Sequence, residues 1–328
     1  MSNAFKWIIC LVLFLILTPL SLFLGSVEIP LGAFLGEADQ LQSVIIRESR
    51  IPRTLAAIFA GMGLSLGGLF MQTLFRNPLA GPSVLGLTSG SSLAVGILTL
   101  GGGVLATSQI AVVSAAAIGA LAVLLLILAV TSRFAHISSV LIVGLMLGFF
   151  ASAIVSLLQA YADESSLKTF VFWGFGSFSN LAFDQIWMYT LPLALSIIIA
   201  PVFIKPLNHL LLGVLHAQSM GVHVKRLQLI LVVITGLMVG IITAFCGPIA
   251  FVGLAVPHLA RLLFSTPDHR TIVPASLLIG ASVALFCDLV ARMPFSELAL
   301  PLNTVLAFMG APVVIYLIFK GRKSQIFS

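Results

Sequence analysis

Long uncharged runs separated by short charged segments dominate the sequence. Six runs without Asp, Glu, Lys or Arg suit one membrane-spanning helix each, which needs roughly 20 residues: 7–27, 54–75, 134–162, 185–204, 271–287 and 298–319. Two longer runs, 77–132 and 227–260, exceed one span and are broken at Gly101-Gly102-Gly103 and Gly247-Pro248. With two helices in each longer run, the pattern predicts an all-α polytopic membrane protein of about ten transmembrane helices.

The composition agrees with a single transmembrane domain over residues 1–328. Hydrophobic residues fill 60% of the positions, charged residues only 8%, and the mean hydropathy is +1.19, which excludes a soluble globular protein. The net charge of +6 comes from Lys and Arg scattered between apolar runs, so no nucleic-acid partner is expected. Cys10, Cys246 and Cys287 are isolated in apolar segments, so we expect buried thiols and no metal, redox site or cofactor.

The charges also predict an orientation. Positive residues collect in the cytoplasmic loops of membrane proteins. Ten helices with a cytoplasmic amino terminus place eleven of the sixteen Lys and Arg residues inside, with Asp268 as the one acidic residue there. We therefore expect both termini in the cytoplasm. The cations expected outside are Arg47, Arg50, Arg53, Lys168 and Arg292.

A polar segment at residues 205–226 interrupts the apolar pattern on the side predicted to be cytoplasmic. Pro206 is typical of a first helical turn, and Gly213 and Gly221 stand where short helices end at a residue with positive φ. The segment therefore predicts two short helices lying across the membrane surface. An ordinary connecting loop is the alternative that composition leaves open.

Several polar residues have structural interpretations. Asp288 and Arg292 are four residues apart, so on one helix they share a face and can pair, which lowers the cost of an acid at lipid depth. His258 is interpreted as a packing histidine near a helix end. Arg76-Asn77-Pro78 indicates a turn with an inside cation, and the glycines of 54–75 favour close helix packing.

Motifs along nearly the whole chain resemble one family. In order they are Arg50-Ile51-Pro52-Arg53, Arg76-Asn77-Pro78-Leu79-Ala80-Gly81-Pro82, Gly247-Pro248-Ile249-Ala250-Phe251-Val252-Gly253-Leu254, Pro257-His258, Arg261, Asp268-His269-Arg270, Asp288, Arg292 and Gly310-Ala311-Pro312. Each motif is short, but their order and spacing over more than 250 residues are specific. The chain resembles the FecCD family of ABC-transporter permeases, which take up iron-siderophores, haem and vitamin B12.

The resemblance implies a ten-helix permease that works as a homodimer in the bacterial cytoplasmic membrane, with two separate ATPase subunits inside and one substrate-binding protein outside. It assigns contact with the ATPase to Leu207, Leu212, Gly213, Ala217 and Gly221. It assigns docking of Glu side chains of the binding protein to Arg50, Arg53 and Arg292, for which interfacial anchoring or local pairing with Glu48 is the alternative. It implies structural roles for Arg76, Asn77, Pro78, Gly247, Pro248, Gly253, Pro257, His258, Arg261, Asp268, His269, Arg270 and Asp288.

Two positions depart from the family pattern. Val214 stands where the family usually has an acidic residue, and Ala299-Leu300 precedes Pro301 where the family usually has Glu-Leu. The inference about the fold is unaffected, because these are single side chains. The polar details of ATPase pairing need not follow the family.

The sequence contains no motif for catalysis. It lacks a Gly-x-x-x-x-Gly-Lys-Ser/Thr phosphate loop, so we expect a non-catalytic subunit that receives its energy from a partner ATPase. The rival hypothesis is a secondary transporter driven by an ion gradient, which would depend on Asp288 or on the break at Gly247-Pro248. An intramembrane enzyme would need paired carboxylates or a nucleophile with its base, which the sequence lacks. The substrate stays open between an iron-siderophore, haem and a corrinoid.

Overall fold

The computed structural model describes residues 2–25, 29, 39–101, 108–133, 137–292 and 300–321, which form helices and turns without a strand. Seven stretches of this part are helical, long and apolar enough to cross a membrane. They contain α1 (Asn3–Phe23), α3 (Ile51–Leu74), α5 (Gln109–Arg133), α6 (Ile137–Tyr161), α8 (Ile186–Ile199), α11 (Val224–Cys246) and α13 (His269–Ala291). Three further apolar helices are α4 (Leu87–Leu100), α12 (Val252–Phe264) and α14 (Leu302–Gly321). The ten predicted helices are therefore confirmed.

Helical structure begins earlier in the second span than the sequence predicted. α2 (Gln40–Ile45) and a π-helical turn (Ile46–Arg50) run directly into α3, so helical structure begins ahead of the uncharged run 54–75. Pro52 is the second residue of α3 and lies directly after the π-helical turn, where its missing N–H interrupts the regular helical hydrogen bonds.

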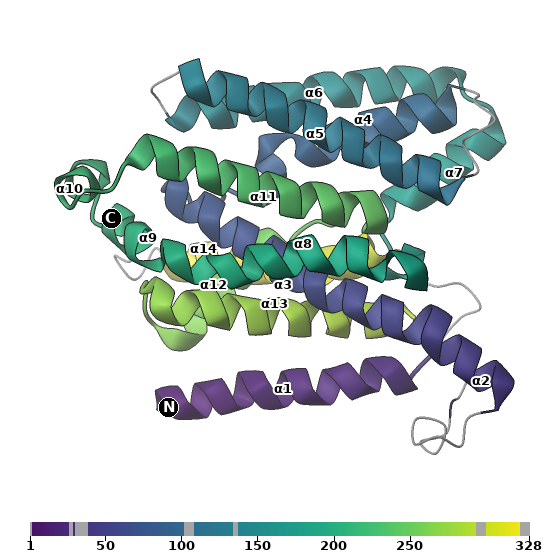
Figure 1. Ribbon diagram of the computed structural model, residues 1–328, viewed down its shortest axis with the longest axis horizontal. Helices are drawn as coiled ribbons and strands as arrows, with labels where there is room; N and C mark the ends of the chain where they lie inside the picture. Colours follow the sequence, from purple (N-terminus) through teal and green to yellow (C-terminus); the bar gives the residue numbers. More distant parts are fainter. Residues whose placement is uncertain are drawn as a thin grey trace.

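The helices run between two ends of the bundle (Figure 1). The α9–α10 end carries the start of α1 and the short helices α9 (Ile204–Leu211) and α10 (Val214–Ser219), whereas the α2–α7 end carries α2 and α7 (Glu164–Gly174). Most of the cations that were predicted to be cytoplasmic lie near helix termini at the α9–α10 end. They include Lys6, Arg76, Lys205, Lys225 and Arg270. Arg50, Arg53 and Arg292 lie at the opposite end.

α3 is the central helix of the bundle. It packs against α13, α11, α12 and α8, and 78% of its most apolar stretch is buried, against 17% for α1 and for α6. The glycines expected to permit close packing lie at its crossings. A Cβ on Gly61 would fall on the carbonyl oxygen of Gly280 in α13, and a Cβ on Gly68 would fall on that of Gly253 in α12. Backbones can approach this closely only where both helices lack a side chain.

The break between α11 and α12 is held by a side chain from α14. Asn303 accepts a hydrogen bond from the Ala250 N–H at 3.0 Å and donates to the carbonyls of Pro248 at 2.7 Å and Gly174 at 3.3 Å. Gly247 ends α11 with φ 72°. Irregular backbone inside a membrane must find its hydrogen bonds within the protein. Asn303 supplies these bonds, so the break is a supported structural feature.

Replacing Gly61 with alanine is expected to destabilise the folded chain, because the new methyl group would meet the backbone of α13 and force the two helices apart. Overpacking of this kind costs about 1–3 kcal/mol. A lower thermal unfolding midpoint in detergent would measure it. Gly174→Ala is the matched control, since nothing lies within 4 Å of its added methyl. Equal losses in the two variants would contradict the close crossing.

Candidate functional site

The polar segment at 205–226 forms the two short helices that the sequence predicted. Gly213 precedes α10 with φ 115°, and Gly221 follows it with φ 83°. The Gly213 N–H donates to the Leu210 carbonyl at 3.1 Å, and the Gly221 N–H donates to that of Gln218 at 2.9 Å. Both predicted positive-φ positions are confirmed, and the alternative of an ordinary loop is wrong.

The α9–α10 pair has one face buried in the bundle and one exposed. Leu207, Leu210 and Ala217 are buried, so Leu207 and Ala217, assigned to ATPase contact, hold the pair to its own chain. Leu212 is 69% exposed and Leu215 is 80% exposed. Leu211 and Met220 extend this apolar surface. Exposed large apolar side chains that lie together mark interaction sites. Of the residues on this exposed apolar surface, the sequence indicated Leu212 as a contact residue. Leu211, Leu215 and Met220 were not predicted.

A hydrogen-bonded chain joins α9 to the spanning helices. The Asn208 side chain donates to Asp268 Oδ1 at 2.6 Å and accepts from the His269 backbone N–H at 2.9 Å. Its Oδ1 also accepts from His269 Nδ1 at 2.8 Å, so Nε2 of the neutral ring accepts from the Thr73 hydroxyl at 2.9 Å. The chain therefore runs from α9 through the start of α13 to the end of α3. Asn208 was not singled out by the sequence, because its partners lie 60 residues away.

Asp268 caps α13 at this junction. Its carboxylate accepts from the Arg270 backbone N–H at 2.9 Å, and this bond, followed by the one from Asn208, lowers the pKa of Asp268. The carboxylate is therefore ionised at neutral pH. A negative charge at a helix N-terminus is favourable, which fits the structural role assigned to Asp268.

The loop after α3 is tied to α12. His258 Nε2 donates to the Pro78 carbonyl at 2.7 Å, as expected for a packing histidine. Arg261 Nη1 donates to Gln72 Oε1 at 2.7 Å, and Gln72 Nε2 donates to the Leu254 carbonyl at 3.1 Å. These bonds give His258 and Arg261 structural roles at the α9–α10 end.

The arginine–aspartate cluster, made of Arg50, Arg53, Asp288 and Arg292, lies at the α2–α7 end. Arg53 donates to both carboxylate oxygens of Asp288, with Nε at 3.0 and 3.1 Å and Nη2 at 2.9 Å. Arg292 Nη2 lies 3.1 Å from Asp288 Oδ2. Arg50 and Arg292 both donate to the carbonyl of Leu24, the residue that follows α1. The cluster therefore ties α1, α3 and α13 together.

The predicted Asp288–Arg292 pair is confirmed, but Arg53 is a second partner that the sequence did not indicate. The alternative of Glu48 pairing is not what holds Arg53, because Glu48 lies 3.6 Å from Arg47 and Arg53 binds Asp288. The side chain of Arg53 is 21% exposed and that of Arg292 is 8% exposed. Among these groups Arg53 therefore offers more surface to a partner than Arg292.

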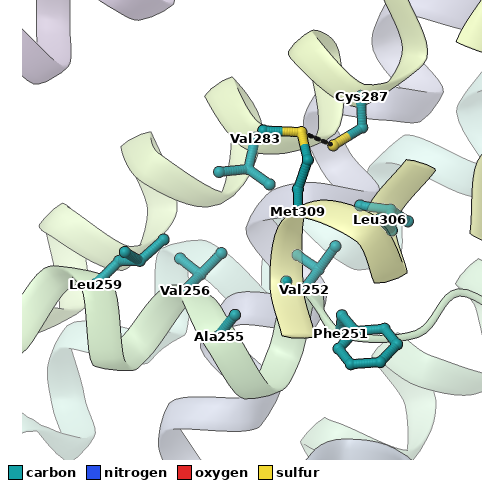
Figure 2. A pocket seen from close by; sticks show the side chains of 10 residues that line it. Phe251, Val252, Ala255, Val256, Leu259, Val283, Cys287, Leu306 and Met309 are labelled. Atoms are coloured by element: carbon teal, nitrogen blue, oxygen red, sulfur yellow. Dashed lines mark hydrogen bonds between the residues drawn. The ribbon is translucent and has the colours of Figure 1, made fainter. Parts of the chain in front are cut away.

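An apolar pocket of about 70 Å³ lies between α12, α13 and α14 (Figure 2). Its lining is aliphatic and aromatic apart from two sulfur atoms, and the Cys287 thiol donates to the Met309 sulfur at 3.5 Å. Cys10 and Cys246 are buried like Cys287, which agrees with the expected packing thiols. In the described part of the chain, no three His, Cys, Asp or Glu residues are grouped to hold a metal ion.

The arrangement defines a class: a multi-pass permease with the fold of BtuC-like ABC importers. A solved structure of an inward-facing metal-chelate type ABC transporter superposes with a TM-score of 0.85 at 29% identity, covering 97% of this chain and all of that one. Residues 12–320 match the FecCD transport family. The chain belongs to this family.

Relatives include vitamin B12 import system permease proteins BtuC. That of Klebsiella pneumoniae is 36% identical over 321 residues, covering 97% of this chain and 94% of the relative. That of Escherichia coli O9:H4 is 34% identical over 322 residues, covering 97% of this chain and 96% of the relative. Together with the spanning helices, these relatives place the chain among multi-pass proteins of the inner membrane.

Asp288→Asn is expected to destabilise the chain strongly, because it leaves Arg53 and Arg292 facing each other without a carboxylate. Breaking a buried pair costs about 3–5 kcal/mol. Adding Arg292→Gln should recover part of the loss, since one of the uncompensated charges is then removed. Unfolding midpoints in detergent measure both effects.

Arg47→Gln provides the control, because its pair with Glu48 is exposed and worth about 0–1 kcal/mol. Simple additivity of the Asp288 and Arg292 single effects would show that the two side chains do not act as a pair.

Proposed function

We propose that the chain is the transmembrane permease subunit of an ABC importer for a metal chelate or corrinoid. It forms a single transmembrane domain and works without catalysis of its own, since a separate ATPase supplies the energy. The observation that carries this proposal is the α9–α10 pair, which exposes an apolar surface while Asn208 fastens it to α13.

Energy reaches the membrane helices through that contact. The ATPase binds Leu211, Leu212, Leu215 and Met220, and its movement displaces α9 and α10 as a rigid unit. The Asn208 bonds pass the displacement to α13. A partner can shift a conformational equilibrium only through contacts that differ between the two states, and a helix pair bonded to a spanning helix supplies such a contact.

The α9–α10 end faces the cytoplasm. Lys6, Arg76, Lys205, Lys225 and Arg270 support this orientation, because cations of short loops are retained inside. The amino terminus is then cytoplasmic. With ten spans, the carboxyl terminus is also cytoplasmic. The α2–α7 end faces outward, where the binding protein docks on the arginine–aspartate cluster through Glu side chains.

The permease acts as a homodimer with two ATPase subunits, and its cargo passes between the two copies. The names of the relatives support a corrinoid, and the name of the structural neighbour supports a metal chelate. Iron-siderophore and haem remain alternatives within the same chemical class.

The rival function, ion-driven secondary transport, has little support from the two features that favoured it. Asp288 is bound by two arginines, and the carbonyl of Pro248 accepts from Asn303. The test is reconstitution in liposomes with the partner ATPase and binding protein. We expect uptake of a chelate that requires ATP. Uptake by the permease alone under a proton or sodium gradient would support the rival instead.

Gly213→Val is expected to weaken coupling in that system. Gly213 has φ 115° and ψ 157°, a region that residues other than glycine rarely enter, whereas its added side chain would meet open space. The strain should tilt α10 without unfolding the bundle. Chelate uptake should fall about 5- to 150-fold, for a strain of about 1–3 kcal/mol, while insertion persists. Ser219→Val, at an ordinary helical position of α10, is the control. Wild-type uptake by Gly213→Val would remove the helix pair from the coupling role.

Arg53→Glu is expected to weaken docking of the binding protein and to reduce uptake. Because the change also removes the bonds to Asp288, rescue by a charge-reversed binding protein is needed to separate docking from a structural loss. An arginine binds a carboxylate in a directional, bidentate way. Wild-type docking should also weaken with added salt, because partly exposed pairs are screened. Arg47→Glu, an exposed change at the same end, is the control.

A Glu→Arg change on the binding protein should restore part of the association with the Arg53→Glu permease. If no acidic residue on either lobe of the binding protein gives recovery, the arginines are structural and do not form the docking site.

A further inference from the structure

A recess of about 240 Å³ lies between the beginning of α4 and the second half of α6. Its lining is unusual for spanning helices, because five of the six residues carry a hydroxyl group and none is charged. The lining residues are Thr88, Ser89, Ser92, Ser152, Val155 and Ser156. The recess is separate from the α9–α10 pair and from the arginine–aspartate cluster.

Several hydroxyls elsewhere on the spanning helices are satisfied by their own backbone, although the buried hydroxyls of Thr235 and Ser276 have no partner among the described residues. Thr99, Thr190, Ser196 and Ser282 each donate to the carbonyl four residues earlier, at 2.8 Å. This local bond lets a hydroxyl lie in an apolar environment at little cost.

The recess departs from that pattern. Ser156 donates to the Ser152 carbonyl at 2.9 Å, as on the other helices. Within the described part of the chain, the hydroxyls of Thr88, Ser89, Ser92 and Ser152 make no hydrogen bond to protein. Four hydroxyl groups that form no hydrogen bond to the described protein therefore line the same cavity.

The recess lies deep within the span. Ser152 is about 22 Å from the start of α6 and about 14 Å from its end, at 1.5 Å per residue. A bilayer core is about 30 Å thick, so lipid tails would surround this depth if the recess faced lipid. Because lipid offers no hydrogen bonds, leaving four hydroxyls unpaired there would be costly. The recess is therefore suited to water or to a polar ligand.

Close helix contacts define the cavity on two sides. A Cβ on Gly86 would lie 2.6 Å from the Gly144 carbonyl, so α4 and α6 touch below the recess. Beyond it, a Cβ on Gly96 would lie 3.5 Å from the Val155 side chain. Between these contacts, Ser89 also lies close to α6, since a Cβ on Gly148 would be 3.3 Å from its hydroxyl oxygen. The recess therefore results from the way in which α4 and α6 pack against each other.

We propose that this recess is part of the transport pathway and binds neutral hydrogen-bonding groups, amides or hydroxyls, on the edge of the cargo. Hydroxyls can donate to an amide oxygen and accept from an amide N–H. No cation lines the cavity, so a free carboxylate there would stay uncompensated. The recess therefore favours a neutral chelate edged with amides over one edged with carboxylates. This inference rests on the proposed function.

Thiol labelling tests whether the recess holds water, without knowledge of the cargo. Ser152→Cys in the assembled transporter should react with a charged, membrane-impermeant methanethiosulfonate reagent. Leu125→Cys on α5, an apolar position that is 57% exposed, should not react. The three native cysteines are buried and give a low background. If Ser152→Cys is as unreactive as Leu125→Cys, the recess faces lipid or is closed, and the proposal is wrong.

Transport tests the ligand. Vitamin B12, a ferric trihydroxamate and haemin are offered to reconstituted wild type and to the triple variant Ser89→Ala, Ser92→Ala, Ser152→Ala. We expect one of the two neutral chelates to be the cargo, and the variant to reduce its uptake by about a hundredfold, since three hydrogen-bonding hydroxyls are removed. The control replaces two back-bonded hydroxyls on α8, Thr190→Val and Ser196→Ala, and should transport normally.

The outcomes separate the two proposals. ATP-dependent uptake that the triple variant leaves unchanged overturns the recess as a ligand site while keeping the ABC permease. Haemin as the sole cargo overturns the preference for a neutral edge. Absence of ATP-dependent uptake of all three chelates by wild type counts against the proposed function and the ligand assignment, whereas the labelling result still decides whether the recess is aqueous.

Discussion

The antiparallel contact between α3 and α13 is the constraint on which the rest of the structure depends. Helices in lipid are not driven together by hydrophobic burial, so they need close backbone packing and polar links. Gly61 meets Gly280 in the middle of this pair. Thr73 meets His269 at the α9–α10 end, and Arg53 meets Asp288 at the α2–α7 end. Contacts at the middle and at both ends make the two helices one mechanical unit.

This unit explains how two partners on opposite sides of a membrane can influence each other. Under the proposed function, the ATPase acts on α9, whose Asn208 is bonded to the first residue of α13. The binding protein acts at the last turn of the same helix, about 33 Å away. A rigid helix pair that both partners touch lets each bias the same conformational equilibrium, and such coupling is reciprocal.

Two polar arrangements in the bundle are held by partners from other helices. Asp288 is matched by Arg53 and Arg292, and Asn303 supplies bonds to the broken backbone after α11. These bonds lower the cost of burying polar groups in a low-dielectric environment. The hydroxyls between α4 and α6 are the contrast, because their packing leaves them open to a cavity. This difference supports the proposal that the recess binds water or a polar ligand.

Much of this architecture can be predicted from short stretches of the sequence. The number of spanning helices follows from hydropathy over about 20 residues at a time, and the positive φ of Gly213 and Gly221 follows from their place after short helices. The Asp288–Arg292 pair follows from a spacing of four. The partners that decide function are distant: Arg53 lies 235 residues from Asp288, and Asn208 lies 61 residues from His269. Local patterns determine which helices form and which faces are apolar. Only the packing of those helices determines which polar side chains meet, because an arginine or a serine has the same local signature whether it faces a partner, a cavity or lipid.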